Sequence, residues 1–215
     1  PMRFEVTHPS QRTRVTDSGF ENGDRIGLFA SSTDKPLEIG GNLVNNEPLT
    51  CSGSSWTASR TLYWDEGTYN FYAYYPYMTS VSSIEDLPFS VQTDQSTADG
   101  YEASDFLWGK VADVAPTDRV IRLPMAHRMA NARVTLTEGT GFADGEWEQT
   151  ERTVLVANLI RGARINLNDG TVKAKGSVEP TATVPARVGD EWRAIVVPQT
   201  VAAGTTLFTI TVGGI

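Results

Sequence analysis

The sequence predicts an all-β protein. Apolar and polar residues alternate with a period of two in several segments, and stretches rich in Gly, Asn, Pro and Ser separate those segments. No segment combines sustained helical spacing with helix caps. The 215 residues suit one large all-β domain or two smaller ones, and either can bury a sizeable core.

The composition narrows the function classes. Hydrophobic residues make up 40% of the chain, which is typical of a globular rather than a disordered protein. The net charge of −8, without any basic run, argues against binding to nucleic acid or to an anionic membrane surface. Cys51 is the only cysteine, so an internal disulfide and a Cys-based zinc site are both excluded. We expect no metal and no cofactor.

The first strands can be placed from the alternation. In residues 2–8, Met2, Phe4 and Val6 fall on one face and polar residues on the other. We expect further strands at 24–30, 56–64 and 69–77, and a long loop from about residue 31 to residue 55.

Residues 69–77, YNFYAYYPY, contain six aromatic rings. Phe71, Ala73 and Tyr75 share one face of the expected strand, and two further tyrosines share the other face. This pattern favours a central strand covered on both sides over a ligand platform. Pro76 lacks the N–H group that a ladder needs, so we expect the strand to end there, with Tyr77 near the rim.

The remaining strands follow the same rules. The polar segment 139–151 is interpreted as the boundary between two domains. Asp169-Gly170 suits a two-residue type I′ hairpin within 163–176. The other strands are expected at 104–111, 120–128, 129–139, 153–160, 191–201 and 206–215.

Catalytic and ligand-binding patterns are weak. The chain has no G-x-S-x-G elbow, H-E-x-x-H motif, P-loop or Rossmann glycine pattern, and we expect His127 to be structural. The carboxylates between Asp94 and Asp105 could hold calcium, but their spacing does not match an EF-hand, so a solvated acidic loop is favoured. Aromatic residues could stack on sugars, although most tryptophans of a β-sandwich are core anchors; the candidate glycan contacts are Trp56, Tyr77 and Trp108.

Six sequence segments, in the same order along the chain, resemble sequences of the fimbrillin family of Bacteroidales. This family comprises the Mfa-like and FimA-like major and minor fimbrial subunits. They span nearly the whole chain and read FENGDRIGLFA, YNFYAYYPY, SDFLWGK, LPMAHRMANARVTLTEGTGF, NLIRGARINLNDGTV and WRAIVVPQTVAAGTTLFTITVGG.

The resemblance implies a fold of two transthyretin-like β-sandwich domains in tandem. The first would span residues 1–140 and include a leader strand at 2–8. The second would span 151–215 and be incomplete at its C-terminus. It also implies export through the periplasm as a lipoprotein precursor, although the lipobox cysteine is absent and the internal Cys51 cannot replace it.

In such subunits a protease removes the leader strand after an arginine, and a strand from the next subunit fills the groove. The matching cleavage points here are Arg12 and Arg14, and the matching groove plug is Met2, Phe4 and Val6. Donor-strand pairing restores the ladder while alternate side chains fill the slot. Burying the three plug side chains is worth roughly 5–8 kcal/mol before ordering costs.

The resulting hypothesis is a non-enzymatic fimbrial subunit at the cell surface or outer membrane that assembles by donor-strand exchange and supports adhesion. Its partners would be other fimbrial subunits, a processing protease and a surface receptor. The alternative is a monomeric surface adhesin or lectin that binds glycans through exposed aromatics. A secreted glycan-active enzyme ranks third.

Overall fold

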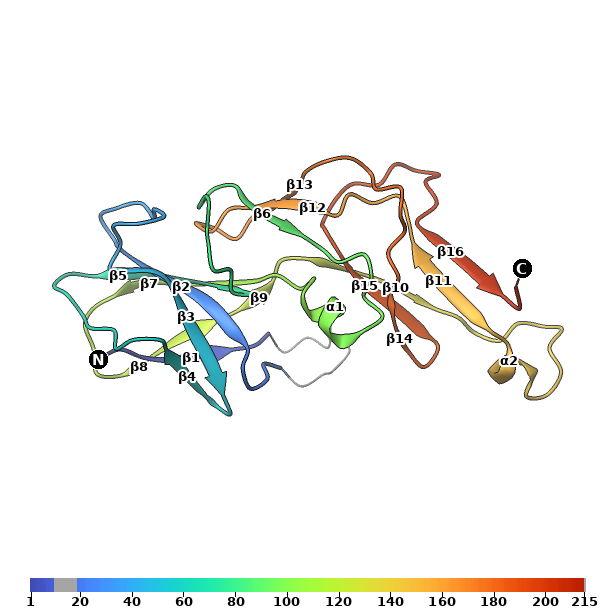
Figure 1. The fold of residues 1–215 in the computed structure, drawn as a ribbon, viewed down its shortest axis with the longest axis horizontal. Coiled ribbons are helices and arrows are strands. Elements are labelled where there is room, and N and C mark those ends of the chain that lie inside the picture. Colours follow the sequence, from blue (N-terminus) through green and yellow to red (C-terminus); the bar gives the residue numbers. More distant parts are fainter. Residues whose placement is uncertain (10–18, 215) are drawn as a thin grey trace.

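A computed structural model describes residues 1–9 and 19–214. Almost all of its regular structure is β, as the alternation predicts (Figure 1). The chain is elongated, and its two termini lie at opposite ends. The two helices, α1 (Ala98–Glu102) and α2 (Glu146–Gln149), are single short turns. Neither these nor any other helix in the described ranges has the length and apolar character of a membrane span.

The largest sheet has eight strands in the order β8-β1-β4-β3-β2-β5-β7-β9. In chain order these strands are β1 (Arg3–Thr7), β2 (Arg25–Ser32), β3 (Val44–Ser52), β4 (Ser55–Ala58), β5 (Tyr69–Tyr75), β7 (Leu107–Val114), β8 (Val120–Pro124) and β9 (Ala126–His127).

Three smaller sheets complete the fold, in the orders β10-β15-β14, β11-β16 and β13-β12-β6. Their strands are β6 (Leu87–Ser90), β10 (Ala130–Thr135), β11 (Arg152–Val156), β12 (Gly162–Ile165), β13 (Val172–Ala174), β14 (Ala186–Val188), β15 (Glu191–Val196) and β16 (Phe208–Val212).

Two apolar cores lie on opposite faces of β5. The large sheet bends so that β1, β4 and β8 lie across from β5 and β7, and the first core fills the space between them (Figure 1). The second core lies between the outer face of β2, β5 and β7 and the strands β6, β12 and β15. Phe71, Ala73 and Tyr75 point into the first core, whereas Tyr72 and Tyr74 point into the second. The prediction of a strand covered on both sides is confirmed, and β5 ends immediately before Pro76.

The expected loop at 31–55 is wrong, because it contains the nine-residue strand β3. Asn45, Asn46 and Pro48 hide this strand in the sequence. The ladder between β3 and β4 extends only as far as Leu49 and Ala58, so Pro48 lies where β3 has only β2 beside it. The missing N–H of Pro48 therefore costs no bond to β4.

Other boundaries also differ from the expectation: the expected strand 120–128 is divided into β8 and β9, and the strands expected at 153–160 and 191–201 end at Val156 and Val196. Of the expected strand 56–64, only residues 56–58 belong to a strand, β4. The expected two-residue hairpin is wrong, since the last paired residues of β12 and β13 are Ile165 and Val172. Gly170 has a φ of +72°, and it closes a longer turn in which its N–H donates to the carbonyl of Asn166 at 2.7 Å.

Strands from both sides of segment 139–151 share sheets. β10 pairs with β15 along six residues, and β6 pairs with β12 along four. The boundaries 1–140 and 151–215 remain a prediction, but they do not coincide with a division between sheets.

Candidate functional site

The strand β1, which the resemblance predicts to be a leader strand, has one buried face and one exposed face. Met2, Phe4 and Val6 are each only 8% exposed, whereas Arg3 and Glu5 point to solvent. Because side chains alternate along a strand, this is the outcome that the sequence pattern predicts for a strand laid over an apolar slot.

Two strands flank β1 and hold it unequally. Its five residues pair in parallel with β8, from Arg3 opposite Val120 to Thr7 opposite Pro124. On the other side it pairs with β4 at a single position, Phe4 opposite Trp56. One further backbone bond lies at each end: the Met2 N–H donates to the Leu62 carbonyl at 2.8 Å, and the Met125 N–H donates to the Thr7 carbonyl at 3.0 Å.

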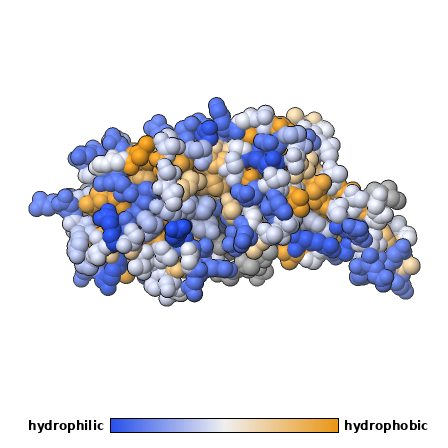
Figure 2. Space-filling view, viewed as in Figure 1, coloured by the Kyte–Doolittle hydropathy of each residue, from blue (hydrophilic) through white to orange (hydrophobic). Residues whose placement is uncertain are grey.

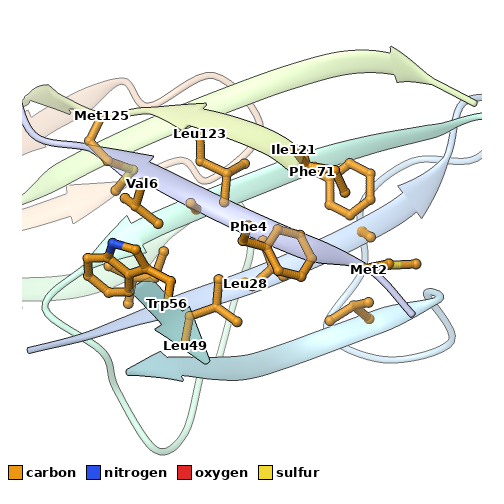
Figure 3. Close-up of a cluster of buried hydrophobic side chains, with 14 of the residues drawn as sticks. Met2, Phe4, Val6, Leu28, Leu49, Trp56, Phe71, Ile121, Leu123 and Met125 are labelled. Atoms are coloured by element: carbon orange, nitrogen blue, oxygen red, sulfur yellow. The ribbon is translucent and has the colours of Figure 1, made fainter. Parts of the chain in front are cut away.

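The slot under β1 is part of the first core (Figure 3). The Phe4 and Phe71 rings meet edge to face with centroids 6.0 Å apart, a favourable geometry for an aromatic pair. Other side chains of the slot come from β2, β3, β4 and β8, and they include Leu28, Leu49, Trp56, Ile121 and Leu123.

The exposed face of β1 adds little stability. Nε of Arg122 lies 3.1 Å from a Glu5 carboxylate oxygen, but both side chains are largely in water, where such pairs contribute little. Arg3 donates to the backbone carbonyl of Asp118. Burial of the three apolar side chains therefore contributes more to the attachment of β1 than these surface side-chain contacts do.

β1 ends beside the two histidines of the chain. The His8 ring packs edge-on against Phe20 and against His127, with centroid separations of 5.0 and 5.5 Å. Nδ1 of His127 lies 2.9 Å from the carboxylate of the buried Asp105. This packed environment agrees with the structural interpretation of His127. The expected cleavage points Arg12 and Arg14 follow in the chain and lie outside the described residues.

The three candidate glycan contacts do not come together. Trp56 belongs to the first core at 9% exposure, and Trp108 belongs to the second at 8%. Nε1 of Trp108 donates to the Leu167 carbonyl at 2.8 Å. Tyr77 is half-buried, with the guanidinium of Arg25 5.3 Å from its ring centre. The indole rings thus act as core anchors and offer little surface to a sugar.

The carboxylates between Asp94 and Asp105 do not form a cluster either. Asp94 accepts hydrogen bonds from Ser96, and these bonds lower the pKa of its carboxyl. Asp105 points inward to His127. Within residues 1–9 and 19–214, no group of three or more His, Cys, Asp or Glu side chains is placed to hold a metal ion. Cys51 is buried in the first core, and this burial raises the pKa of its thiol.

A buried carboxylate on β3, two strands from β1 in the sheet, was not predicted from the sequence. Glu47 on β3 is 6% exposed, and it accepts hydrogen bonds from Ser59 Oγ at 2.6 Å and from Arg60 N and Nε at 3.3 and 3.1 Å. These bonds fix the chain just after β4. No sequence signal could have revealed Glu47, because it lies in a segment interpreted as a loop.

A groove of about 640 Å³ opens next to this fixed segment. It runs beside the N-terminal half of β1, and its lining includes Phe4, Thr57, Arg60, Thr61 and Val120. Most of the lining lies on β1 and on the side of β1 that pairs with β4 at only one position, and Val120 of β8 is the exception. Elsewhere, on the face seen in Figure 2, the surface is mostly hydrophilic and apolar residues form small separate areas.

Comparison with known proteins shows which family this chain belongs to. The profile of the family described as fimbrillin-like matches residues 13–215, nearly the whole chain. The chain belongs to the fimbrillin-like family. One curated relative of this fimbrillin-like protein carries the name of a fimbrium tip subunit, Fim1C, of Bacteroides ovatus. It is 35% identical over an alignment of 111 residues, with 44% of this chain and 20% of the relative covered. The match thus spans about a fifth of the length of that relative.

Solved structures share the fold. A protein of Bacteroides uniformis described as a cell adhesion protein has a TM-score of 0.72 and 22% identity, with 98% of this chain and 78% of that chain covered. A second one described in these words, from Bacteroides ovatus, has a TM-score of 0.68 and 17% identity, with 92% and 77% covered. A fimbrial protein from Bacteroides ovatus has a TM-score of 0.60 and 22% identity, with 93% and 42% covered.

Proposed function

We propose that this protein is a fimbrial subunit that assembles by donor-strand exchange. The observation that supports the proposal best is the seat of β1, in which Met2, Phe4 and Val6 fill an apolar slot between β8 and β4. Residues 10–18, which follow this strand, contain the expected cleavage points Arg12 and Arg14. The role is structural and adhesive rather than catalytic.

Removal of β1 would create a site for another strand. The large sheet would part between β8 and β4, leaving unpaired N–H and C=O groups on both sides. It would also expose the apolar slot to water. A strand with alternating apolar side chains, supplied by a neighbouring subunit, would restore the ladder and fill the slot.

Family membership supports the cellular setting of the proposal. We place the mature subunit at the cell surface in a fimbrium, after export through the periplasm as a lipoprotein precursor. Its partners are other fimbrial subunits, the protease that cleaves after Arg12 or Arg14, and a surface receptor. The fimbrial and cell adhesion descriptions of the relatives agree with this setting.

A reversible lock on β1 tests the assembly mechanism. Glu5 and Arg122 lie directly opposite each other on β1 and β8, so the pair Glu5→Cys and Arg122→Cys can form a disulfide. We expect the oxidised full-length subunit to stay out of fimbriae isolated from cells that make it, because its β1 cannot leave. Reduction of the purified, cleaved protein should restore assembly.

The control locks two strands away from the slot. Thr135 and Glu191 lie opposite each other on β10 and β15, so Thr135→Cys with Glu191→Cys gives a matched disulfide. This variant should assemble like the wild type. Incorporation of the oxidised Glu5–Arg122 variant at the level of this control would overturn the proposed mechanism.

A further inference from the structure

The flank of β1 that faces β4 is held open. Between the pair Phe4–Trp56 and the bond from Met2 N–H to the Leu62 carbonyl, the chain from Ser59 to Thr61 leaves the ladder. Its other flank, against β8, is paired along its whole length. An attacking strand therefore meets a closed seam on one side of β1 and an open groove on the other.

Glu47 ties one wall of the groove to β3. Its carboxylate accepts hydrogen bonds from the side chain of Ser59 and from the backbone N–H and guanidinium of Arg60, and Arg60 lines the groove. Burial of a carboxylate is costly unless hydrogen bonds compensate for it, and here these bonds do so. Glu47 is a positioning residue, and it lies on the same face of β3 as Leu49, which lines the slot.

We propose that the groove between β1 and the segment from Ser54 to Leu62 is where an incoming donor strand first binds, before β1 has left. This inference rests on the proposed function. The occupant is an extended segment of another fimbrial subunit with apolar side chains at alternate positions, because the seated β1 shows that the adjoining slot accepts that pattern. The incoming strand enters beside Arg3, between the Phe4–Trp56 pair and the Met2–Leu62 bond, and then displaces β1 residue by residue.

The physical reason for such a route is the barrier to simple dissociation. If β1 left first, three apolar side chains and two strand edges would meet water at the same time. Stepwise displacement replaces each lost contact as it breaks, so the open groove lowers the barrier. The two routes predict different kinetics.

The concentration dependence of self-exchange separates these routes. The full chain would carry a specific protease site within residues 10–18, be cleaved there, and be mixed with a fluorescent peptide of residues 1–9. The leaving and incoming strands have the same sequence, so the initial and final states have the same free energy. The exchange rate therefore reports only on the route by which one strand replaces the other. We expect the exchange rate to rise linearly with peptide concentration.

Filling the groove provides a second readout. Thr57 is exposed on β4 and lines the groove, so Thr57→Trp should slow exchange about tenfold. The matched control is Thr50→Trp, because Thr50 lies opposite Thr57 on β3, one strand farther from β1, and does not line the groove. This control should exchange like the unmodified chain.

Two outcomes contradict the inference, and they differ in meaning. Exchange at a rate independent of peptide concentration, and equal in the two tryptophan variants, would show that β1 leaves first; this overturns the role of the groove and leaves strand replacement intact. Absence of any exchange after complete cleavage would overturn both the groove and the proposed function.

Discussion

The strands β1 and β5 belong to the same sheet but differ in how much of the fold depends on them. β5 separates two cores, and its side chains are buried on both faces. β1 contributes to one core only and shows its other face to solvent. A strand with two buried faces cannot leave without opening the whole molecule, whereas a strand with one buried face can be exchanged. This difference agrees with the proposal that β1 is the replaceable plug.

The largest effect is expected for β5. Phe71 is fully buried, and its ring contacts both Phe4 and Trp64. Phe71→Ala should lower the free energy of unfolding by about 3–5 kcal/mol, because a cavity replaces a large ring in the first core. Urea denaturation followed by tryptophan fluorescence measures this loss. A loss below that of Phe4→Ala would contradict the ranking of the two strands.

Phe4→Ala should cost less, about 3 kcal/mol or below, since this side chain is slightly exposed and its strand can detach locally. Hydrogen exchange should show lost protection confined to β1 and the flanking strands β8 and β4. The second core should keep the protection of the wild type. Lost protection throughout β5 would show that β1 cannot detach alone.

Contact between β2 and β5 can be tested at a glycine. A Cβ atom at Gly27 would lie 2.1 Å from Cε1 of Tyr74, whose hydroxyl donates to Asn46 Oδ1 at 2.7 Å and so holds the ring in place. Gly27→Ala should therefore destabilise the protein by about 1–3 kcal/mol through overpacking. Gly40→Ala is the control, because no atom lies within 4 Å of its Cβ position. Equal thermal midpoints of the two variants would contradict this account.

The second core also predicts a pH effect. Burial raises the pKa of Tyr101 to about 12, while Arg193 and the hydrogen bond from Asn131 act in the opposite direction. Between pH 10 and 12 the unfolded chain releases this proton and the folded chain keeps it, so stability falls as the pH rises. Urea midpoints across this range should fall less steeply for Tyr101→Phe. Identical slopes would contradict a buried neutral phenol.

The sequence predicts β1 and β5 well, because their strict alternation and aromatic content record burial directly. It does not reveal β3, whose Asn, Glu and Pro residues are typical of a loop and become part of a strand only through partners on β2 and β4. For the same reason the groove could not be predicted. One of its lining residues, Arg60, is held by Glu47, and this contact is set by the tertiary fold rather than by any local pattern.

Pairings between distant segments are equally hidden. The polar segment 139–151 resembles a linker, yet β10 before it and β15 beyond it form a six-residue ladder. Two of the candidate glycan contacts, Trp56 and Trp108, could not be separated from core anchors by sequence, since a tryptophan on a strand is compatible with either role.

The central claim is that β1 is a replaceable plug, and a chain of residues 19–215 tests it most directly. Its thermal midpoint would be measured with increasing amounts of a peptide of residues 1–9. We predict a low midpoint without peptide and a rise that continues with peptide concentration, because ligand binding to the folded state alone stabilises it by mass action. A peptide carrying Phe4→Ala should act only at much higher concentration. A midpoint equal to that of the intact chain, unmoved by either peptide, would contradict the account.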